Sequence, residues 1–281
     1  MYSPNTKFNY IRYNSLPSFA DFVLDYDKSY YDGWGIDITH NLTIGIDLEK
    51  VSPYSKIFVK TDLIENYLDI LQKIPVPYHL LTGVSDIFLE NSLIEKILKT
   101  KIVSWCGNNL AKYDERFLQV PIGFCEKGSQ RPNAFTEYVE LSEEKIIDLV
   151  VTPFTETHSE RKDLSNLYGR NILNISNKID YSKFLTVLGL SRYSCCPRGN
   201  GYDTHRVIES ILMNSIPIVK SSPLDPLYKE LGAVIVNEWG DSKYLNFAAT
   251  RNLNREVLTE EYWKCKITTH QQTMSNNKFN I

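Results

Sequence analysis

The sequence predicts an α/β protein built from parallel βα units. Short apolar runs typical of buried strands alternate with segments whose apolar residues recur at helical spacing. Residues 193–220 contain, in order, the pattern of a strand, a glycine-bearing loop, a helix and a second strand. The chain has 281 residues, enough for one large or two small domains with a substantial core.

In the first half, residues 1–35 are aromatic and polar without a steady period, and we expect an extended arm there. A helix is then expected over 61–74, ended by Pro75 and Pro77, and a second one over 92–98. The expected strands are 56–60, 78–82, 101–105 and 117–123. The polar stretch 124–145 is the expected linker, so we predict an N-terminal domain over 1–140.

In the second half, the predicted C-terminal domain covers 141–281. Its expected strands are 146–154, 172–175, 193–196, 216–219 and 233–236. Its expected helices begin near Thr157, Asp180, Thr204 and Ser221, and two more are expected over 241–248 and 254–266. The last of these could return to the first domain, and the polar tail after Thr268 is expected to fray.

The loop from Arg198 to Gly201 is the most informative segment. Its glycines allow positive φ angles and close approach of a ligand to the backbone. Asp203 or Thr204 can cap the following helix, whose first N–H groups have no internal partners and attract anions. Arg206 adds a guanidinium suited to phosphate oxygens. The pattern therefore predicts an anion site.

Glu209 lies about one and a half turns into the same helix. Its carboxylate can accept hydrogen bonds from two sugar hydroxyls, so a diphosphate joined to a ribose would suit the loop and the helix together. The alternative is an ordinary βα turn in which Arg206 and Glu209 form an exposed i,i+3 pair.

The run from Cys196 to Lys220, CPRGNGYDTHRVIESILMNSIPIVK, resembles the signature of the exostosin-like glycosyltransferases, glycosyltransferase family 47 and its viral and microbial relatives. It departs from that pattern at Ser210, where alanine is usual, and at Ser215, where glycine is usual. The first half has similar elements: Thr82-Gly83 followed by Ser85-Asp86, then Asn108-Asn109, then residues 121–123.

The resemblance implies a compact pair of facing Rossmann-like domains (GT-B type), with the acceptor on the N-terminal domain and the nucleotide sugar on the C-terminal one. It implies a metal-independent, inverting transferase that moves a sugar, with xylose as the first guess, from a UDP-sugar to a glycan hydroxyl. Arg206 would then bind the diphosphate and Glu209 the ribose. The full donor-binding set that we predict is Thr157, Arg161, Arg198, Gly199, Asn200, Gly201, Thr204, His205, Arg206, Glu209 and Ser221.

Inverting transfer needs a general base for the acceptor hydroxyl. Asp86, which follows a predicted strand and a glycine, is our choice, with His205, Glu156 and Asp37 as substitutes. For Asp86 the alternative role is that of an ordinary turn carboxylate. A protein that binds nucleotide sugar or glycan on the same scaffold without catalysis is the alternative function.

Composition and charge limit the classes of partner and the cellular location that we expect. A net charge of −3 predicts no nucleic-acid partner. No run approaches the roughly 18 apolar residues of a membrane span, and the N-terminus has no secretory pattern, so we expect a cytoplasmic protein of a microbe or of a virus-infected cell.

The five cysteines lack metal-site spacing, and the acidic pair Asp25 and Asp27 precedes any recognisable strand of a nucleotide site, so no metal or other cofactor is expected. Cys195 and Cys196 lie near His205, which would suit a thiol nucleophile. Two small buried residues at a strand end are the interpretation that we favour.

Overall fold

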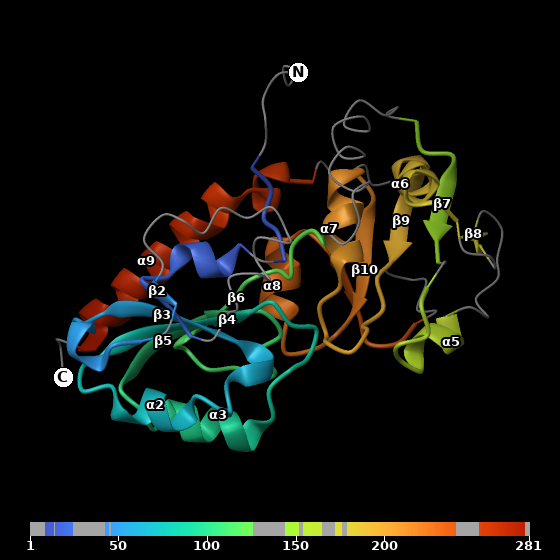
Figure 1. The fold of residues 1–281 in the computed structure, drawn as a ribbon. Helices are drawn as coiled ribbons and strands as arrows, with labels where there is room; N and C mark the ends of the chain where they lie inside the picture. The colour runs from blue at the N-terminus through green and yellow to red at the C-terminus, as the bar shows by residue number, and fades with distance from the viewer. Residues whose placement is uncertain are drawn as a thin grey trace.

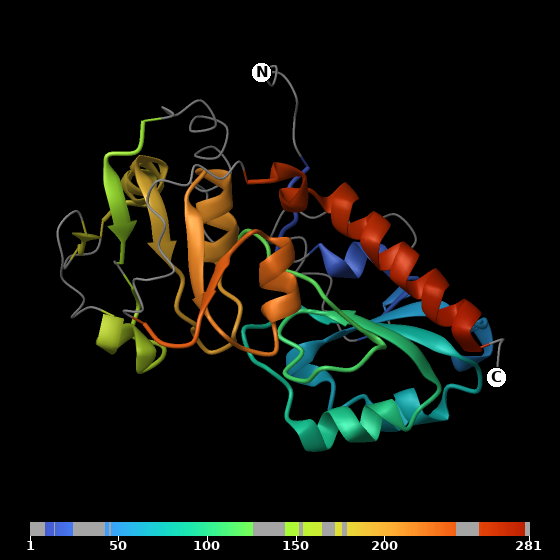
Figure 2. The same cartoon turned by 180° about the vertical axis from the view of Figure 1, so that it is seen from behind.

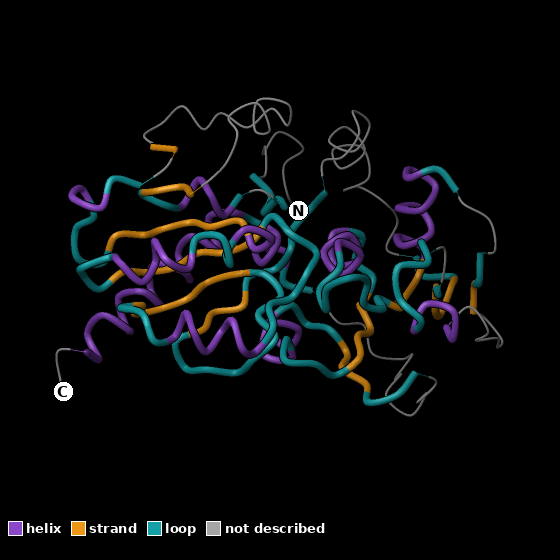
Figure 3. Tube along the Cα trace, turned by 60° about the horizontal axis from the view of Figure 1, so that its bottom comes forward, coloured by secondary structure: helices purple, strands orange, loops and turns teal. Residues whose placement is uncertain are grey.

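The computed structural model describes residues 9–13, 15–24, 43–44, 46–125, 144–151, 154–164, 172–175, 179–239 and 253–278. Within these residues the chain forms two parallel sheets, which Figure 3 shows in opposite halves of the molecule. The predicted boundary between 140 and 141 and the helix expected over 241–248 lie outside the described residues.

The first sheet has six parallel strands in the order β2-β1-β3-β4-β5-β6 (Figure 1). The strands are β1 (Phe22–Leu24), β2 (Thr43–Ile44), β3 (Ser55–Lys60), β4 (Tyr78–Gly83), β5 (Ile102–Gly107) and β6 (Phe117–Gln119). Every residue of β4 and β5 is buried, as expected for central strands covered on both faces. Helices α2 (Leu68–Lys73) and α3 (Asn91–Leu98) cover one face.

The second sheet has five parallel strands in the order β11-β10-β9-β7-β8. They are β7 (Ile147–Val150), β8 (Ile172–Leu173), β9 (Ser191–Cys195), β10 (Ile216–Lys220) and β11 (Val234–Val236). The associated helices are α5 (Glu160–Leu164), α6 (Tyr181–Leu190), α7 (His205–Leu212) and α8 (Asp225–Glu230). The short 3-10 helices of the chain are η1 (Leu16–Phe19), η2 (Leu48–Lys50), η3 (Thr61–Leu63) and η5 (Arg255–Leu258).

The two parallel sheets with flanking helices confirm the predicted fold class, α/β with two Rossmann-like units. The apolar positions predicted for α7, Val207, Ile208, Ile211 and Leu212, are all buried. None of the helices within the described ranges is long and apolar enough to cross a bilayer.

Three expectations for individual elements are wrong. The arm expected over 1–35 contains a buried strand, β1. The helix expected over 61–74 is broken into η3 and α2, with turns between them. The tail expected to fray after Thr268 instead continues α9 (Glu260–Lys278) to its end at Lys278.

Helix α9 follows the second sheet in the chain but lies on the first sheet, on the side opposite α2 and α3 (Figures 1 and 2). Trp263 and Ile267 are buried. His270 Nε2 lies 2.9 Å from the Arg116 carbonyl oxygen, and Ser275 Oγ lies 3.3 Å from His79 Nε2 on β4. These tertiary contacts stabilise α9, whose own sequence is largely polar.

The loops after β4, β5 and β6 meet the loop after β9, so the carboxyl edges of the two sheets face each other. The backbone N–H of Asp203 donates to Asn109 Oδ1 at 2.7 Å, and the N–H of Ile122 donates to Asp203 Oδ2 at 2.7 Å. Gly201 is so close to the Asp86 carbonyl oxygen and the Asn109 amide that a Cβ there would collide with both. We call this contact between the loops 108–123 and 201–205 the seam.

Candidate functional site

The strand order places a topological switch point in each sheet. In both, the first strand of the sheet lies between the second and the third, which puts the switch points between β1 and β3 and between β7 and β9. Open α/β sheets bind ligands outside the carboxyl ends of the strands at such points. Thr157 and residues 198–201 lie in the loops that follow β7 and β9, and Arg161 lies in the first turn of α5. With Arg206, seven of the predicted donor-binding residues lie at or beside this point.

Arg161 connects the two loops. Its Nε donates to the Arg198 carbonyl at 2.9 Å, and its Nη1 donates to the carbonyl and hydroxyl oxygens of Thr155 at 2.9 and 3.1 Å. Burial lowers the pKa of Arg161, while the charges of Glu160 and Asp86 act in the opposite direction. These hydrogen bonds hold the positively charged guanidinium at the switch point.

Gly199 lies directly over this guanidinium. A Cβ at Gly199 would stand 2.9 Å from Arg161 Nη2 and 3.2 Å from Thr157 Oγ1. The structure thus brings Gly199 against Thr157 and Arg161, which lie far from it in the sequence. A hydroxyl and a guanidinium are groups that suit phosphate oxygens.

Arg206 reaches the same point from α7. Its Nη1 lies 3.1 Å from the Val151 carbonyl oxygen and 3.5 Å from that of Cys195, at the carboxyl ends of β7 and β9. The guanidinium carbon stacks over the rings of Phe154 and Phe184, at 4.3 and 4.8 Å from their centroids. Burial lowers the pKa of Arg206 to about 10, a shift that the charges of Cys196 and Glu209 limit.

Glu209 is only 6% exposed, and its Oε1 accepts a hydrogen bond from the Tyr181 hydroxyl at 2.8 Å. The alternative interpretation of Arg206 and Glu209 as an exposed surface pair is therefore wrong. The assignments of Arg206 to a diphosphate and of Glu209 to a ribose stay predictions.

Arg198 lies between aromatic rings from both halves of the chain. Its guanidinium carbon is 4.1 Å from the Tyr202 ring centroid and 5.5 Å from that of Phe88, which belongs to the loop after β4. Its Nη2 donates to the Asn200 carbonyl at 3.3 Å, and its buried Nε has no hydrogen-bond partner among the described residues. Asn200 itself is exposed beside it.

Asp86 faces these loops from the first domain. Its side chain is exposed, its backbone carbonyl lies against Gly201, and its charge acts on Arg161. The preceding Ser85 holds the loop, since its hydroxyl donates to Asp62 and accepts from the backbone N–H of Ile87 at 3.1 Å. The candidate base therefore lies across the seam from the arginines.

The substitute bases are placed less favourably. Glu156 is exposed and pairs with Lys162 at 3.6 Å, and Asp37 lies outside the described residues. His205 Nδ1 lies 2.7 Å from the Gly123 carbonyl oxygen, so this nitrogen is already engaged by the first domain.

Two other predicted donor residues have different surroundings. Thr204 occupies the N-cap position of α7, but its Oγ1 makes no hydrogen bond among the described residues, so its side chain does not cap the helix as expected. The Thr204 N–H instead donates to Asp203 Oδ1 at 2.9 Å. Ser221 is exposed after β10 and donates to Asp225 Oδ2 at 2.8 Å.

Cys195 and Cys196 are both buried, each 2% exposed, as in the interpretation that we favoured. Burial raises the pKa of Cys196 to about 11. A thiol with this pKa is a poor nucleophile at neutral pH.

Asp203 is the residue whose importance the sequence did not reveal. It is 4% exposed and accepts from backbone N–H groups on both sides of the seam. Burial raises the pKa of its carboxyl to about 6, against the lowering effect of the hydrogen bonds from Ile122 and Thr204. The only sequence signal was its place just before a helix, which is equally typical of an ordinary cap.

This pKa predicts a pH dependence of stability. Between the unfolded value of 3.8 and about 6, the folded protein binds more protons at Asp203 than the unfolded chain. The contribution of this group to the unfolding free energy is therefore complete below pH 3.8 and is lost as the pH rises through 6, by up to about 3 kcal/mol. Urea melts between pH 4 and 7 should show this decline in the wild type, and Asp203→Ala should lack it. An identical pH slope in both proteins would contradict the assignment.

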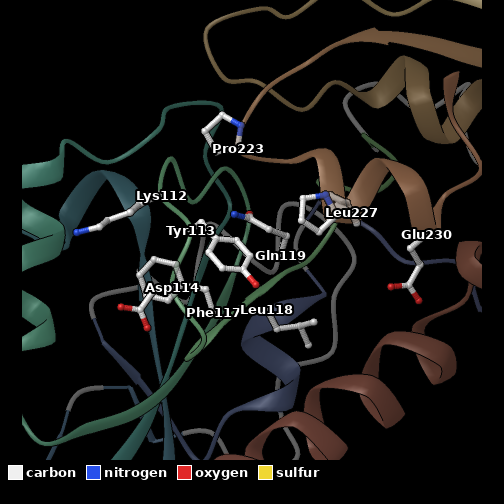
Figure 4. Close-up of a pocket in the computed structure, with 10 residues that line it drawn as sticks. Lys112, Tyr113, Asp114, Phe117, Leu118, Gln119, Pro223, Leu227 and Glu230 are labelled. Atoms are coloured by element: carbon white, nitrogen blue, oxygen red, sulfur yellow. The ribbon is translucent and has the colours of Figure 1, made fainter. Parts of the chain in front are cut away.

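A separate hollow lies beside the seam, between the β5–β6 segment and α8 (Figure 4). Tyr113, Gln119 and Leu227 line it. The charged side chains at its edge form ion pairs, Asp114 with Arg116 at 2.9 Å and Glu230 with Lys266. Within the described ranges, no group of three or more His, Cys, Asp or Glu side chains is arranged to hold a metal ion.

No family model and no curated protein matches this chain. Among solved structures, a trehalose-6-phosphate synthase from a study of glycosyl transfer with retention aligns over 83% of this chain and 76% of its own, with 9% identity and a TM-score of 0.38. The N-terminal domain of Candida albicans trehalose-6-phosphate phosphatase aligns over 91% of this chain and 80% of its own, with 11% identity and a TM-score of 0.39. Similarity at this level assigns no activity to the chain.

Proposed function

We propose that this protein is a glycosyltransferase that moves a sugar from a UDP-sugar to a glycan hydroxyl. The observation that carries the proposal is the convergence of Arg161, Thr157 and Gly199 at the switch point of the second sheet, opposite Asp86 on the first. The resemblance to exostosin-like transferases supports the finer assignment of an inverting, metal-independent reaction, with xylose as the first donor sugar to test. A cytoplasmic location is part of the same proposal.

In the proposed complex the diphosphate lies beside Arg161 and the Thr157 hydroxyl, which contact Gly199. Arg198 and Arg206 add positive charge nearby. The departing UDP gains negative charge in the transition state, and fixed cations in a partly desolvated site stabilise such charge strongly. Glu209 would accept hydrogen bonds from the ribose hydroxyls.

Asp86 would act as the base on the acceptor side. Its carboxylate takes the proton of the acceptor hydroxyl while that oxygen bonds to the anomeric carbon. The bond from this carbon to the UDP oxygen breaks, and the electron pair leaves with UDP. The loop that carries Asp86 is held through Ser85, so the base can face the loops of the second sheet without a large rearrangement.

Calorimetric titration with UDP and a panel of UDP-sugars, in the presence of EDTA, tests the donor site. We expect saturable binding that weakens in Arg206→Ala and Glu209→Ala, with the tightest UDP-sugar naming the donor for an acceptor screen. Absence of binding to any nucleotide sugar would refute the proposal. Binding that needs added Mn²⁺ or Mg²⁺ would refute its metal-independent form.

A non-catalytic protein that binds nucleotide sugars is the second candidate. It would use Arg206 and Glu209 for the donor and lack the transfer step, and the exposed side chain of Asp86 would then be an ordinary turn carboxylate. Asp86→Asn separates the two candidates: an enzyme should lose turnover at least about 100-fold while its donor affinity stays unchanged. Glu90→Gln, an exposed carboxylate four residues later, is the matched control and should keep turnover.

A further inference from the structure

Glu209 is a buried carboxylate that the described part of the chain satisfies only in part. The residue is 6% exposed and lies in the second turn of α7. Its Oε1 accepts from the Tyr181 hydroxyl at 2.8 Å, and this is the one hydrogen bond of its side chain among the described residues. A carboxylate can accept about four hydrogen bonds, and burying it with fewer is unfavourable. The position therefore suits a ligand that supplies further donors.

The charge beside Glu209 indicates which kind of ligand this is. Arg206 lies one turn earlier on the same face of α7, and its guanidinium contacts backbone carbonyls at the carboxyl ends of β7 and β9. The charge of Glu209 opposes the lowering of the Arg206 pKa by burial, so the two groups interact. An anion suits the arginine, but the carboxylate repels it and needs neutral donors. A ribose next to a phosphate offers such donors in its vicinal hydroxyls.

Tyr181 reaches Glu209 from another helix. It is the first residue of α6, and its ring lies 6.2 Å from that of Phe184, over which the Arg206 guanidinium carbon stacks at 4.8 Å. Helix α6 thus contacts both charged groups, with a hydroxyl on the carboxylate and a ring on the guanidinium. The tyrosine hydroxyl is an uncharged donor, so it orients the carboxylate without neutralising it. Without this hydroxyl the carboxylate could turn toward the guanidinium instead.

We propose that Tyr181 is a positioning residue that fixes Glu209 for two ribose hydroxyls, and that this pair makes the site selective for ribonucleotides over 2′-deoxyribonucleotides. The Tyr181 hydroxyl occupies one lone pair of Oε1, and the other lone pairs accept from the 2′- and 3′-hydroxyls. A 2′-deoxy ligand brings one donor fewer, and a site built to hydrogen-bond a hydroxyl rejects the analogue that lacks it. The inference rests on the proposed function, because the ribose belongs to the UDP-sugar, but it does not depend on the transfer step.

Calorimetric titration of the full chain with UDP, 2′-deoxy-UDP and pyrophosphate tests the proposal. In the wild type we expect UDP to bind at least about tenfold more tightly than 2′-deoxy-UDP. Tyr181→Phe keeps the ring and removes only the hydroxyl. In this variant we expect UDP to bind about five- to tenfold more weakly, and the ratio between the two nucleotides to fall below about threefold. Pyrophosphate has no ribose, so its affinity should change less than about twofold.

Tyr78→Phe is the matched control. Tyr78 begins β4 at the amino edge of the first sheet, and its hydroxyl lies 2.7 Å from Thr100 Oγ1. The variant therefore removes a tyrosine hydroxyl that is bonded to another side chain, at the edge of the sheet opposite the loop that carries Asp86. It should keep the wild-type affinities for all three ligands.

A wild-type ratio near one between UDP and 2′-deoxy-UDP would overturn the proposal, and so would an unchanged ratio in Tyr181→Phe. Equal weakening of UDP, 2′-deoxy-UDP and pyrophosphate in that variant would show that Tyr181 is only structural, which also overturns it. UDP binds to the wild type in all three cases, so the proposed function survives them. A wild type that binds no UDP overturns both. If Tyr181→Phe does not fold, the wild-type ratio decides.

Discussion

Replacing Arg161 with alanine is expected to weaken UDP binding by about 100-fold. The guanidinium is bonded to the loops after β7 and β9 at once, and it packs against Gly199. Its loss removes both the charge that would meet the diphosphate and the connection that holds the two loops together. A charge-assisted hydrogen bond contributes about 1.5–3 kcal/mol, which corresponds to this range of affinity. Calorimetric titration of UDP into both proteins measures the effect.

Lys162→Ala is the matched control, because Lys162 is the next residue, carries the same charge and is well exposed in its pair with Glu156. We expect its UDP affinity to change less than threefold, since surface ion pairs contribute little. Arg161→Lys should resemble the alanine variant more than the wild type, because an ammonium lacks the fork that reaches both loops. Equal affinities for the Arg161 and Lys162 alanine variants would contradict the assignment.

Replacing Asp203 with alanine is expected to lower the free energy of unfolding by about 2–4 kcal/mol at pH 5. The variant leaves the buried N–H groups of Ile122 and Thr204 without their acceptor, at a cost of about 1–3 kcal/mol each. Ionising the buried carboxyl is itself unfavourable, so the wild type carries a cost at pH 8 that alanine relieves. The difference between the two proteins should therefore be larger at pH 5 than at pH 8, as measured by urea unfolding.

Asp47→Ala supplies the comparison for this stability effect. Asp47 is an exposed aspartate whose Oδ1 accepts from the Glu49 N–H at 3.2 Å at the start of η2. Its loss should cost no more than about 1 kcal/mol. A loss at Asp203 no greater than the loss at Asp47 would show that the seam does not depend on this carboxylate.

The elements with strong local patterns were predictable, and those defined by tertiary contacts were not. The strands β4 and β10 and the helix α7 have apolar patterns that fix their type, and the structure confirms them. β1 has three residues, too few to show a period, and it is a strand because β3 lies beside it. The second half of α9 is polar, and the first sheet, rather than helix propensity, determines that it is helical.

The candidate site was likewise predictable only in part. The motif around Arg206 indicated which residues gather near the second sheet, because glycines and arginines before a helix are recognisable in sequence. Spacing along the chain could not show that Arg206 stacks between Phe154 and Phe184, or that Asp203 bonds to Ile122 across the seam. Such contacts join residues tens of positions apart, and only the folded topology determines them.

The return of α9 to the first sheet has a consequence for how the chain folds during synthesis. A ribosome adds residues from the N-terminus, and domains generally fold in that order. Here the strands β3 to β5 are made early, while the helix that covers one of their faces comes after the whole second sheet. The surface of the first domain that packs against Trp263 and Ile267 therefore stays exposed until more than half of the chain has been made after it. A nascent chain of this kind is a natural client for chaperones that shield apolar surface.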